Sequence, residues 1–437
     1  MGVDDEFNGR SRTPSPLPAV HESQLPREHS LFRPRHSRRQ RTALTAAVVF
    51  FCTPLVLLGV GVRPAEFENR KLAEFPSISS GFGFFTGLDA WAADHTPLRD
   101  KAVAVANGVS RGVFGESPQA PRSKQQDVGG PIPVPPKDPS ADRPDPTAYV
   151  RAIEGKDDWL YLGFDVEAGC EPNLPLPEMF GRLVRLRQGV EASGRKFVLV
   201  VAPNKSTVVP EHMPARYFGK TCFEQARTEF WNQVGPLTGA VDLRPGLAEA
   251  AREAGRPVYS KHDSHWTHEG GVVMARAIAD AVQPGLSDDW EVEHGGKVQL
   301  PADLSKLLGR TDSVELDAYR IKPDGESVRS KPVKGDPAAA QQVTQDLVPG
   351  MSNARVGLLG DSFSFYVAQY LVAGFSDITL QHSDAVNSEP LQVAQMLARQ
   401  DVVVLEVAER NLVGGINPLL NPSVIDLIAA ELAKHPR

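Results

Sequence analysis

Three side chains that together can activate a serine hydroxyl occur in two short segments of this chain. Ser362 follows an apolar, strand-like run at 355–359, whereas Asp263 and His265 stand well upstream. A serine hydroxyl is a weak nucleophile until an imidazole accepts its proton, and a carboxylate must hold that imidazole in the right tautomer. We therefore predict Ser362 as nucleophile, His265 as base and Asp263 as the orienting acid.

The spacing of these residues suits the elements that must position them. Asp263 and His265 are two residues apart, so on an extended loop both side chains point the same way. A sharp strand-to-helix turn would expose the hydroxyl of Ser362. Asp361 is expected to stabilise that turn or the helix N-terminus, and Ser364 is the second choice of nucleophile.

Simpler interpretations exist for both segments. A Gly-Asp-Ser after a strand is also found in a plain turn with an N-cap serine, and an Asp-x-His can lie in a surface loop. A metal-dependent deacetylase is another alternative, since a cluster of imidazoles and carboxylates suits zinc; its ligands would be His262, Asp263, His265, His268 and Glu269. Because a metal site leaves Gly-Asp-Ser-Phe-Ser unexplained, we predict no metal and no cofactor.

The two segments also carry a family resemblance. Asp-x-His-Trp-Thr upstream of Gly-Asp-Ser-Phe-Ser resembles the SGNH hydrolase-like family of alginate O-acetyltransferases, and further motifs follow in the family's order from residue 66 onward. These are Glu68–Ala73, Asp94–Arg99, Gly155–Leu162, Pro203–Lys205, Val209–Glu211 and Glu406–Arg410. Ordinary SGNH hydrolases place the Gly-Asp-Ser block first, with Asp-x-x-His last. The reversed order seen here is shared by the acetyltransferase family.

The resemblance implies a reaction and two partners. Its activity is O-acetylation of a cell-envelope or secreted polysaccharide through an acetyl-serine, with a multipass membrane acyltransferase as the donor-side partner. Two rival functions use the same scaffold. A carbohydrate O-acetylesterase would employ the same triad with water as acceptor, and a non-catalytic glycan-binding or assembly protein would retain only the fold.

Other polar residues near the expected site have weaker assignments. The backbone N–H of Ser362 is expected to bind the oxyanion, and Asn204, after the first long strand, is a candidate second donor. Trp266 is a candidate sugar platform, although a core position is favoured. Arg410 either orients substrate or forms a structural ion pair with Glu406 or Glu409, and the structural interpretation leads. The same preference applies to Lys205 and Arg99.

Composition and targeting signals place the protein at a membrane. The formal net charge of −7 over 437 residues offers no basic field for nucleic acid. Residues 42–62 form an uncharged apolar stretch of bilayer-spanning length. The upstream arginines at 33, 35, 38, 39 and 41 put the N-terminus in the cytoplasm and the rest outside. A cleaved or twin-arginine signal peptide is the alternative to this single-pass anchor in the cell membrane.

The cysteines fit the same compartment. Cys52 lies within the expected anchor, whereas Cys170 and Cys222 are the only pair outside it. Because thiols oxidise outside the cytoplasm, we predict that Cys170 and Cys222 form a disulfide.

The chain divides into five expected parts. Residues 1–41 read as a disordered basic tail, and residues 63–113 as a juxtamembrane segment that packs on the catalytic domain. Residues 114–148 form a linker or loop, because nine prolines forbid regular structure there. Residues 149–437 form the catalytic domain.

Within that domain, apolar strands alternate with helical patterns, which predicts an α/β fold. Specifically, we expect an SGNH-like three-layer α/β/α sandwich with a mostly parallel sheet. Its strands are expected at 196–202, 240–243, 355–359, 378–380 and 401–407, and its helices at 177–193, 270–282, 364–372 and 424–434.

Overall fold

The computed structural model describes residues 38–59, 88, 91 and 149–437. The chain separates into two units, residues 1–99 and 100–437, and each is treated by itself. Helix α1 (Arg38–Gly59) belongs to the first unit. Most of the expected tail, of the 63–113 segment and of the Pro-rich linker falls outside the described residues, so these assignments stay predictions.

Membrane-spanning potential can be judged only for the part of the chain that is described. There, no single helix qualifies by length and apolar composition, and one bent pair, Glu409–Leu420 with Pro422–Ala433, qualifies at an angle of 54°. The anchor at 42–62 therefore stays a prediction.

A six-stranded mixed sheet forms the centre of the second unit. Its order is β4-β3-β10-β8-β9-β7, and all neighbours are parallel except β7 and β9. The strands span Val241–Asp242 (β4), Lys196–Ala202 (β3), Val402–Ala408 (β10), Ser352–Gly360 (β8), Phe375–His382 (β9) and Gln341–Thr344 (β7). The mostly parallel sheet predicted from the apolar runs is confirmed, with β8 and β9 longer than expected and β4 shorter.

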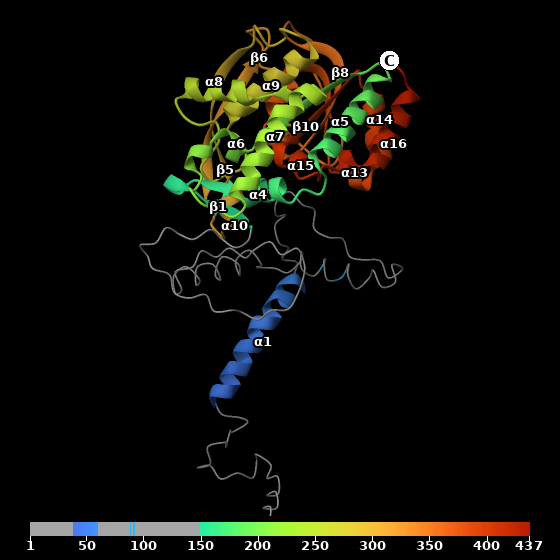
Figure 1. The fold of residues 1–437 in the computed structure, drawn as a ribbon. Coiled ribbons are helices and arrows are strands. Elements are labelled where there is room, and N and C mark those ends of the chain that lie inside the picture. The colour runs from blue at the N-terminus through green and yellow to red at the C-terminus, as the bar shows by residue number, and fades with distance from the viewer. Residues whose placement is uncertain (1–37, 60–87, 89–90, 92–148) are drawn as a thin grey trace, which may run out of the picture. The chain divides into compact units, whose positions relative to one another are not determined.

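Helices cover both faces of this sheet, which explains why its central strands are apolar throughout. Alternate residues of β3 enter two separate cores: Val198 and Val200 face one, and Leu199 and Val201 face the other. Figure 1 shows α5, α14 and α16 gathered on one side of the sheet. The covering helices are α5 (Leu176–Glu191), α7 (Lys220–Thr238), α14 (Pro390–Ala398) and α16 (Pro422–Ala433) on that core, and α8 (Arg244–Ala254) and α9 (His268–Val282) on the other.

The helix expected at 364–372 differs from the structure. It begins two residues earlier and breaks into α11 (Ser362–Tyr366), α12 (Ala368–Leu371) and the 3₁₀ turn Val372–Gly374. Asp361 caps the start, because its Oδ1 accepts a hydrogen bond from Phe363 N at 3.0 Å. The break lies at Val367, whose φ of −130° is outside the helical range.

Two antiparallel hairpins were not predicted. One pairs β1 (Ala152–Glu154) with β2 (Leu160–Leu162), and the other pairs β5 (Glu291–Pro301) with β6 (Ser313–Lys322). The connection from β5 to β6 contains α10 (Asp303–Leu307), and Leu304 of α10 packs with Leu160 in a small separate core. The segment that connects β5 to β6 therefore packs against β2 through α10.

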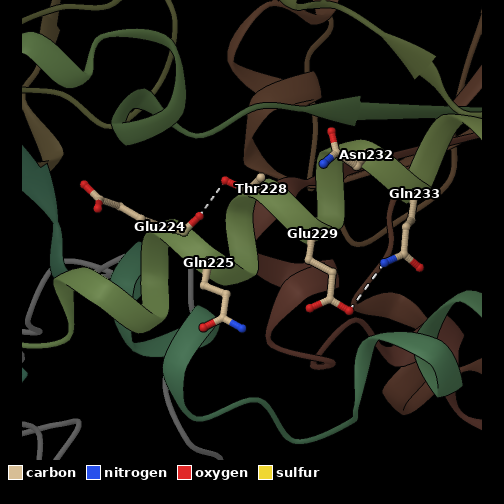
Figure 2. A pocket seen from close by; sticks show the side chains of 6 residues that line it. All are labelled: Glu224, Gln225, Thr228, Glu229, Asn232 and Gln233. Carbon is tan, nitrogen blue, oxygen red and sulfur yellow. Dashed lines mark hydrogen bonds between the residues drawn. The ribbon is translucent and has the colours of Figure 1, made fainter.

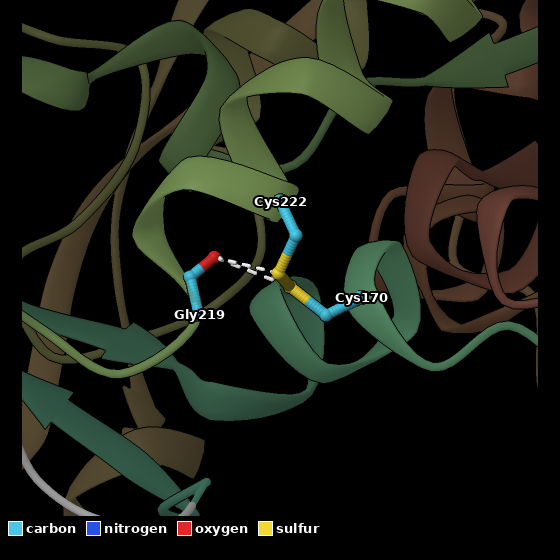
Figure 3. Close-up of a disulfide and its surroundings, with 3 residues drawn as sticks. All are labelled: Cys170, Gly219 and Cys222. Carbon is cyan, nitrogen blue, oxygen red and sulfur yellow. Dashed lines mark hydrogen bonds between the residues drawn. A yellow bond between two sulfur atoms is a disulfide. The ribbon is translucent and has the colours of Figure 1, made fainter.

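A disulfide joins Cys170, at the end of α4 (Gly163–Cys170), to Cys222 in the first turn of α7 (Figure 3). Their Cα atoms lie 5.3 Å apart, within the normal range for a bridge. Both sulfur atoms lie 3.1 Å from the carbonyl oxygen of Gly219. Neither bridged sulfur carries a proton, so these are contacts, not hydrogen bonds. The pairing predicted from the cysteine positions is present.

Replacing both cysteines with serine should lower the free energy of unfolding. The bridge closes a loop with a sequence separation of 52 residues. Constraining such a loop in the unfolded chain stabilises the fold by about 4 kcal/mol. We expect a lower melting temperature for the C170S/C222S variant, and the same decrease for the reduced parent protein. Equal melting temperatures for the oxidised and reduced parent would contradict a stabilising bridge.

Candidate active site

The turn from β8 into α11 places Ser362 at the carboxyl end of a central strand. Gly360 is required there, since a Cβ at this position would lie 2.5 Å from Ser364 Oγ. Asp361 Oδ2 accepts hydrogen bonds from Ala408 N at 2.8 Å and Asn411 Nδ2 at 2.9 Å. Asp361 therefore ties the turn to the end of β10, in the stabilising role expected for it.

His265 contacts both of its predicted partners. Its Nε2 lies 2.9 Å from Ser362 Oγ, and its Nδ1 lies 2.8 Å from Asp263 Oδ1. The same carboxylate oxygen accepts a hydrogen bond from His265 N at 2.9 Å, which fixes the loop that carries the pair. With Nδ1–H donating to the carboxylate, Nε2 is left to accept from the serine hydroxyl. The three groups thus lie within the reach that nucleophilic catalysis requires.

Electrostatics favour charge separation within the Asp263–His265 pair. Burial alone would lower the pKa of His265, but the hydrogen bond to Asp263 and its negative charge outweigh burial, so the pKa is raised. Burial would raise the pKa of Asp263, but the bond and charge of His265 outweigh it and lower the pKa. An imidazolium formed when Ser362 loses its proton is therefore stabilised in place.

Aromatic side chains hold the imidazole. Tyr366 stacks on His265 with ring centroids 4.9 Å apart and an interplanar angle of 9°, and Phe363 packs at 5.0 Å. Trp266 is 0% exposed and packs in a T-shaped arrangement with Phe363, with ring centroids 4.9 Å apart. Trp266 is thus a core residue that supports the site. Its candidacy as a sugar platform is wrong, because no face of the indole is free.

Asn204 and Arg410 contact each other, and Arg410 also contacts Phe363. Asn204 Oδ1 accepts hydrogen bonds from Arg410 N at 3.3 Å and from its NH1 at 3.5 Å. The guanidinium lies 5.0 Å above the Phe363 ring. The expected ion pair of Arg410 with a nearby glutamate is absent from the described contacts; its ionic contact is with Asp165, at 3.9 Å.

Glu406 and Glu409 instead bind neighbouring backbone and hydroxyl groups. Glu406 Oε2 accepts hydrogen bonds from Asp361 N and Ser364 Oγ, and Glu409 Oε2 accepts one from Asn204 N. Burial, assisted by the charge of Asp361, raises the pKa of Glu406 far above its ordinary value. Ser364, 0% exposed and bonded to Glu406, is not available as the alternative nucleophile.

Asp303 and Tyr366 belong to the site but carry no recognisable sequence signal. Asp303 Oδ1 accepts a hydrogen bond from Ser264 N at 2.7 Å, and its Oδ2 lies 3.7 Å from His265 Nδ1. Desolvation and the charge of Asp263 raise the pKa of Asp303. Asp303 comes from α10, between β5 and β6, so only tertiary folding brings it to His265.

The metal cluster considered from the sequence does not assemble. His262 contacts Asp158, His268 bonds Tyr370, and Glu269 bonds Tyr319. Asp263 and His265 do come within reach of a shared ion, but with Asp303 as the third group. Their ligand atoms already bind one another and backbone N–H groups, which suits a hydrogen-bonded triad.

A shallow hollow beside α7 is lined by none of the residues of the candidate active site. Figure 2 shows its six polar lining residues, all from α7; they are Glu224, Gln225, Thr228, Glu229, Asn232 and Gln233. None of them pairs a nucleophile with a base.

Comparison with known proteins identifies the family. The family model described as the SGNH hydrolase-like domain of acetyltransferase AlgX matches residues 152–402, more than half of the chain. The chain belongs to this family. The match contains Asn204, Asp263, His265 and Ser362 and stops before Arg410. The SGNH-like α/β fold and the family resemblance inferred from the motifs are thereby confirmed.

Individual members of the AlgX and AlgJ group are moderately similar. A probable alginate O-acetylase AlgJ of Pseudomonas syringae pv. tomato is 30% identical over 224 residues, which cover 48% of this chain and 54% of that protein. The alginate biosynthesis protein AlgX of Pseudomonas putida is 24% identical over 52% of this chain and 48% of that protein. The chain thus spans about half the length of the curated relatives it matches.

Among solved structures, the O-acetyltransferase domain of Pseudomonas putida AlgJ has 21% identity. The matched region covers 64% of this chain and 98% of the AlgJ domain, with a TM-score of 0.43. Pseudomonas aeruginosa AlgX has 18% identity, covers 63% of this chain and 66% of that one, and has a TM-score of 0.44.

Proposed function

We propose that this protein is a membrane-anchored extracytoplasmic O-acetyltransferase that modifies a cell-envelope or secreted polysaccharide through an acetyl-serine. The observation that carries the proposal is the continuous contact from Asp263 through His265 to Ser362, with Ser362 only half buried at the strand end. Membership of the AlgX acetyltransferase family supports acetyl as the group transferred.

In the first half-reaction, Ser362 Oγ attacks the acetyl carbonyl carbon as its proton moves to His265 Nε2. The tetrahedral intermediate collapses, the donor's leaving group takes that proton, and acetyl-Ser362 remains. In the second, a sugar hydroxyl loses its proton to His265 and attacks the same carbonyl. Collapse releases the acetylated sugar, and the proton returns to Ser362 Oγ.

The developing oxyanion needs donors on the opposite side from His265. Ser362 is the first residue of α11, so its N–H has no acceptor within the helix. Asn204 Oδ1 accepts hydrogen bonds from Arg410, which leaves the Nδ2 hydrogens of Asn204 as its side-chain donors. We assign these two groups to the oxyanion, with Arg410 orienting Asn204.

The deciding experiment follows one acetyl group. With an activated acetyl ester as donor, the protein should gain one acetyl mass on the peptide that contains Ser362. Added acceptor oligosaccharide should discharge this adduct into acetylated sugar faster than water discharges it into acetate. Acetate as the sole product across a range of glycans would favour the rival O-acetylesterase. No adduct on a folded protein would favour the glycan-binding or assembly role.

Anchoring and donor supply are part of the proposal and rest on the sequence. Residues 42–62 would hold the domain outside the cell membrane, and a multipass membrane acyltransferase would supply the acetyl group. A reporter fused after Arg437 should be active only outside the cytoplasm. Reporter activity in the cytoplasm would contradict this orientation.

A further inference from the structure

Lys205 is a fully buried lysine that contacts the loop carrying Asp263. It is 1% exposed, opens the short helix α6 (Lys205–Val208), and follows Asn204 in the chain. Its Nζ lies 4.9 Å from the ring centroid of Trp159 and 5.3 Å from that of Tyr161. Burying an ammonium is costly unless its protons find acceptors, so the partners of Lys205 show what it does.

All three protons of this ammonium go to one loop. Nζ donates hydrogen bonds to the carbonyl oxygens of Ser260, Lys261 at 2.7 Å and Asp263 at 3.1 Å. This loop leads directly into His265. A lysine supplies three donors and no acceptor, so the match with three converging carbonyls is complete.

The same loop is held from its other side by Asp303, which binds Ser264 N and Ser264 Oγ. Lys205 therefore acts from the β3 side and Asp303 from the α10 side. Because Asn204 and Lys205 are consecutive, the assigned oxyanion donor and the clamp on the base loop share one turn. A shift of that turn would move both halves of the site together.

We propose that Lys205 is a positioning residue that holds the Asp263–His265 pair at reacting distance from Ser362. This inference rests on the proposed function, since it assumes that His265 activates Ser362. Small displacements of a base reduce rates strongly, because proton transfer requires hydrogen-bond distance. Lys205 touches no reacting atom, so its effect passes through Asp263 and His265.

Burial lowers the pKa of Lys205 to about 7, and the nearby carboxylates of Asp263, Asp303 and Asp165 oppose that effect. The carboxylates limit the decrease in the pKa without cancelling it, so the charged form that offers three protons is kept below about pH 7. A neutral amine would have only two protons for three carbonyls.

The test measures how fast phenylmethylsulfonyl fluoride labels Ser362. In this reaction Ser362 Oγ attacks the sulfur, fluoride leaves, and His265 takes the proton, so no acetyl donor is needed. The K205M variant keeps the length of the side chain and removes its donors, and we expect labelling to slow by about tenfold or more. The matched control is K196M, since Lys196 is an exposed lysine at the opposite end of β3 from Asn204 and Lys205, and its Nζ donates to one backbone carbonyl, Val282 O at 3.0 Å. K196M should label at the parent rate.

A double-mutant cycle separates positioning from general destabilisation. If Lys205 acts through Asp263, then K205M in a D263N background should cost less than about threefold, because coupled losses do not add. K205R serves as a second variant: it keeps a charge but presents its donors in a planar fork, so it should label at an intermediate rate. Circular dichroism and melting temperature identify which variants are folded.

The outcomes distinguish the clamp from the proposed function. Labelling of folded K205M or K205R within twofold of the parent, or fully additive losses in the cycle, would overturn the clamp alone. Labelling of the parent at Ser362 without acetyl transfer to any glycan would overturn the proposed function and leave the clamp standing. A parent protein that is never labelled at Ser362 would overturn both.

Discussion

Ser362→Ala should abolish acetyl transfer, with a loss of about four to six orders of magnitude in kcat. The substitution removes the only atom that can carry the acetyl group, while His265 and Asp263 keep their contact. His265→Ala should cost nearly as much, because nothing then accepts the proton from Ser362 Oγ. Both rates are measured with an activated acetyl ester and an acceptor oligosaccharide, on proteins shown to be folded.

Combining these changes provides the sharper result. When residues act as one unit, removing one of them already removes the contribution of the others. The variant with alanine at Asp263, His265 and Ser362 should therefore be little less active than Ser362→Ala. Ser364→Ala is the control, since the Ser364 hydroxyl is buried and donates its hydrogen bond to Glu406. In Ser364→Ala the acetyl adduct should persist, and peptide fragmentation should place it on Ser362. Undiminished transfer by Ser362→Ala would reject the serine mechanism.

The strands of the sheet were predictable because burial on both faces demands continuous apolar residues. The run 196–202 is predicted and observed with the same bounds, and 401–407 shifts by one residue. Strand β4 is shorter than expected because only Val241 and Asp242 pair with β3. A strand at the edge of a sheet is specified by one neighbour alone, so its length is poorly encoded in its own composition.

The site was predictable where chemistry constrains residues locally. Asp263 and His265 are two residues apart, and the Gly-Asp-Ser turn marks the end of a strand, so the sequence alone predicts the contact of His265 with Asp263 and Ser362 that the structure contains. Asp303 and Lys205 act through backbone groups of a distant loop. Asp303 stands in no motif, and the Pro203–Lys205 motif does not reveal which groups Lys205 binds. Trp266 was ambiguous for a related reason: an indole serves equally in a core or on a surface, and only packing against Phe363 decides.

Asp263→Asn should reduce kcat by about three to four orders of magnitude while leaving the shape of the site intact. The carboxylate oxygen accepts both His265 N and His265 Nδ1. An asparagine amide can instead donate to Nδ1, which places the proton on Nε2 and removes the acceptor for Ser362. The control is Asp384→Asn, an exposed carboxylate 3.7 Å from His382, which should transfer acetyl at the parent rate.

The pH profile tests the cause of this loss. The base must be neutral, so the rate rises with pH as His265 loses its proton. Asp263 raises the pKa of His265 against the effect of burial. Without that carboxylate, burial dominates, and the acid limb of the Asp263→Asn profile should move to lower pH. A limb that stays in place, or moves to higher pH, would show that Asp263 does not set the protonation of His265.

The Asp263–His265 pair should also make the stability of the fold depend on pH. Because the pKa of His265 is higher in the folded than in the unfolded protein, protonation of His265 stabilises the fold at pH values below its unfolded pKa. This contribution is lost as the pH rises through the folded pKa. The lowered pKa of Asp263 stabilises the fold above its unfolded value, and this is lost as pH falls through the folded pKa. Both contributions coexist at mildly acidic pH, about 4 to 6.5 from the unfolded values. Asp263→Asn should therefore lower the melting temperature most in that window and less in stronger acid and in alkali, whereas an equal decrease at every pH would mean that packing alone connects Asp263 to the fold.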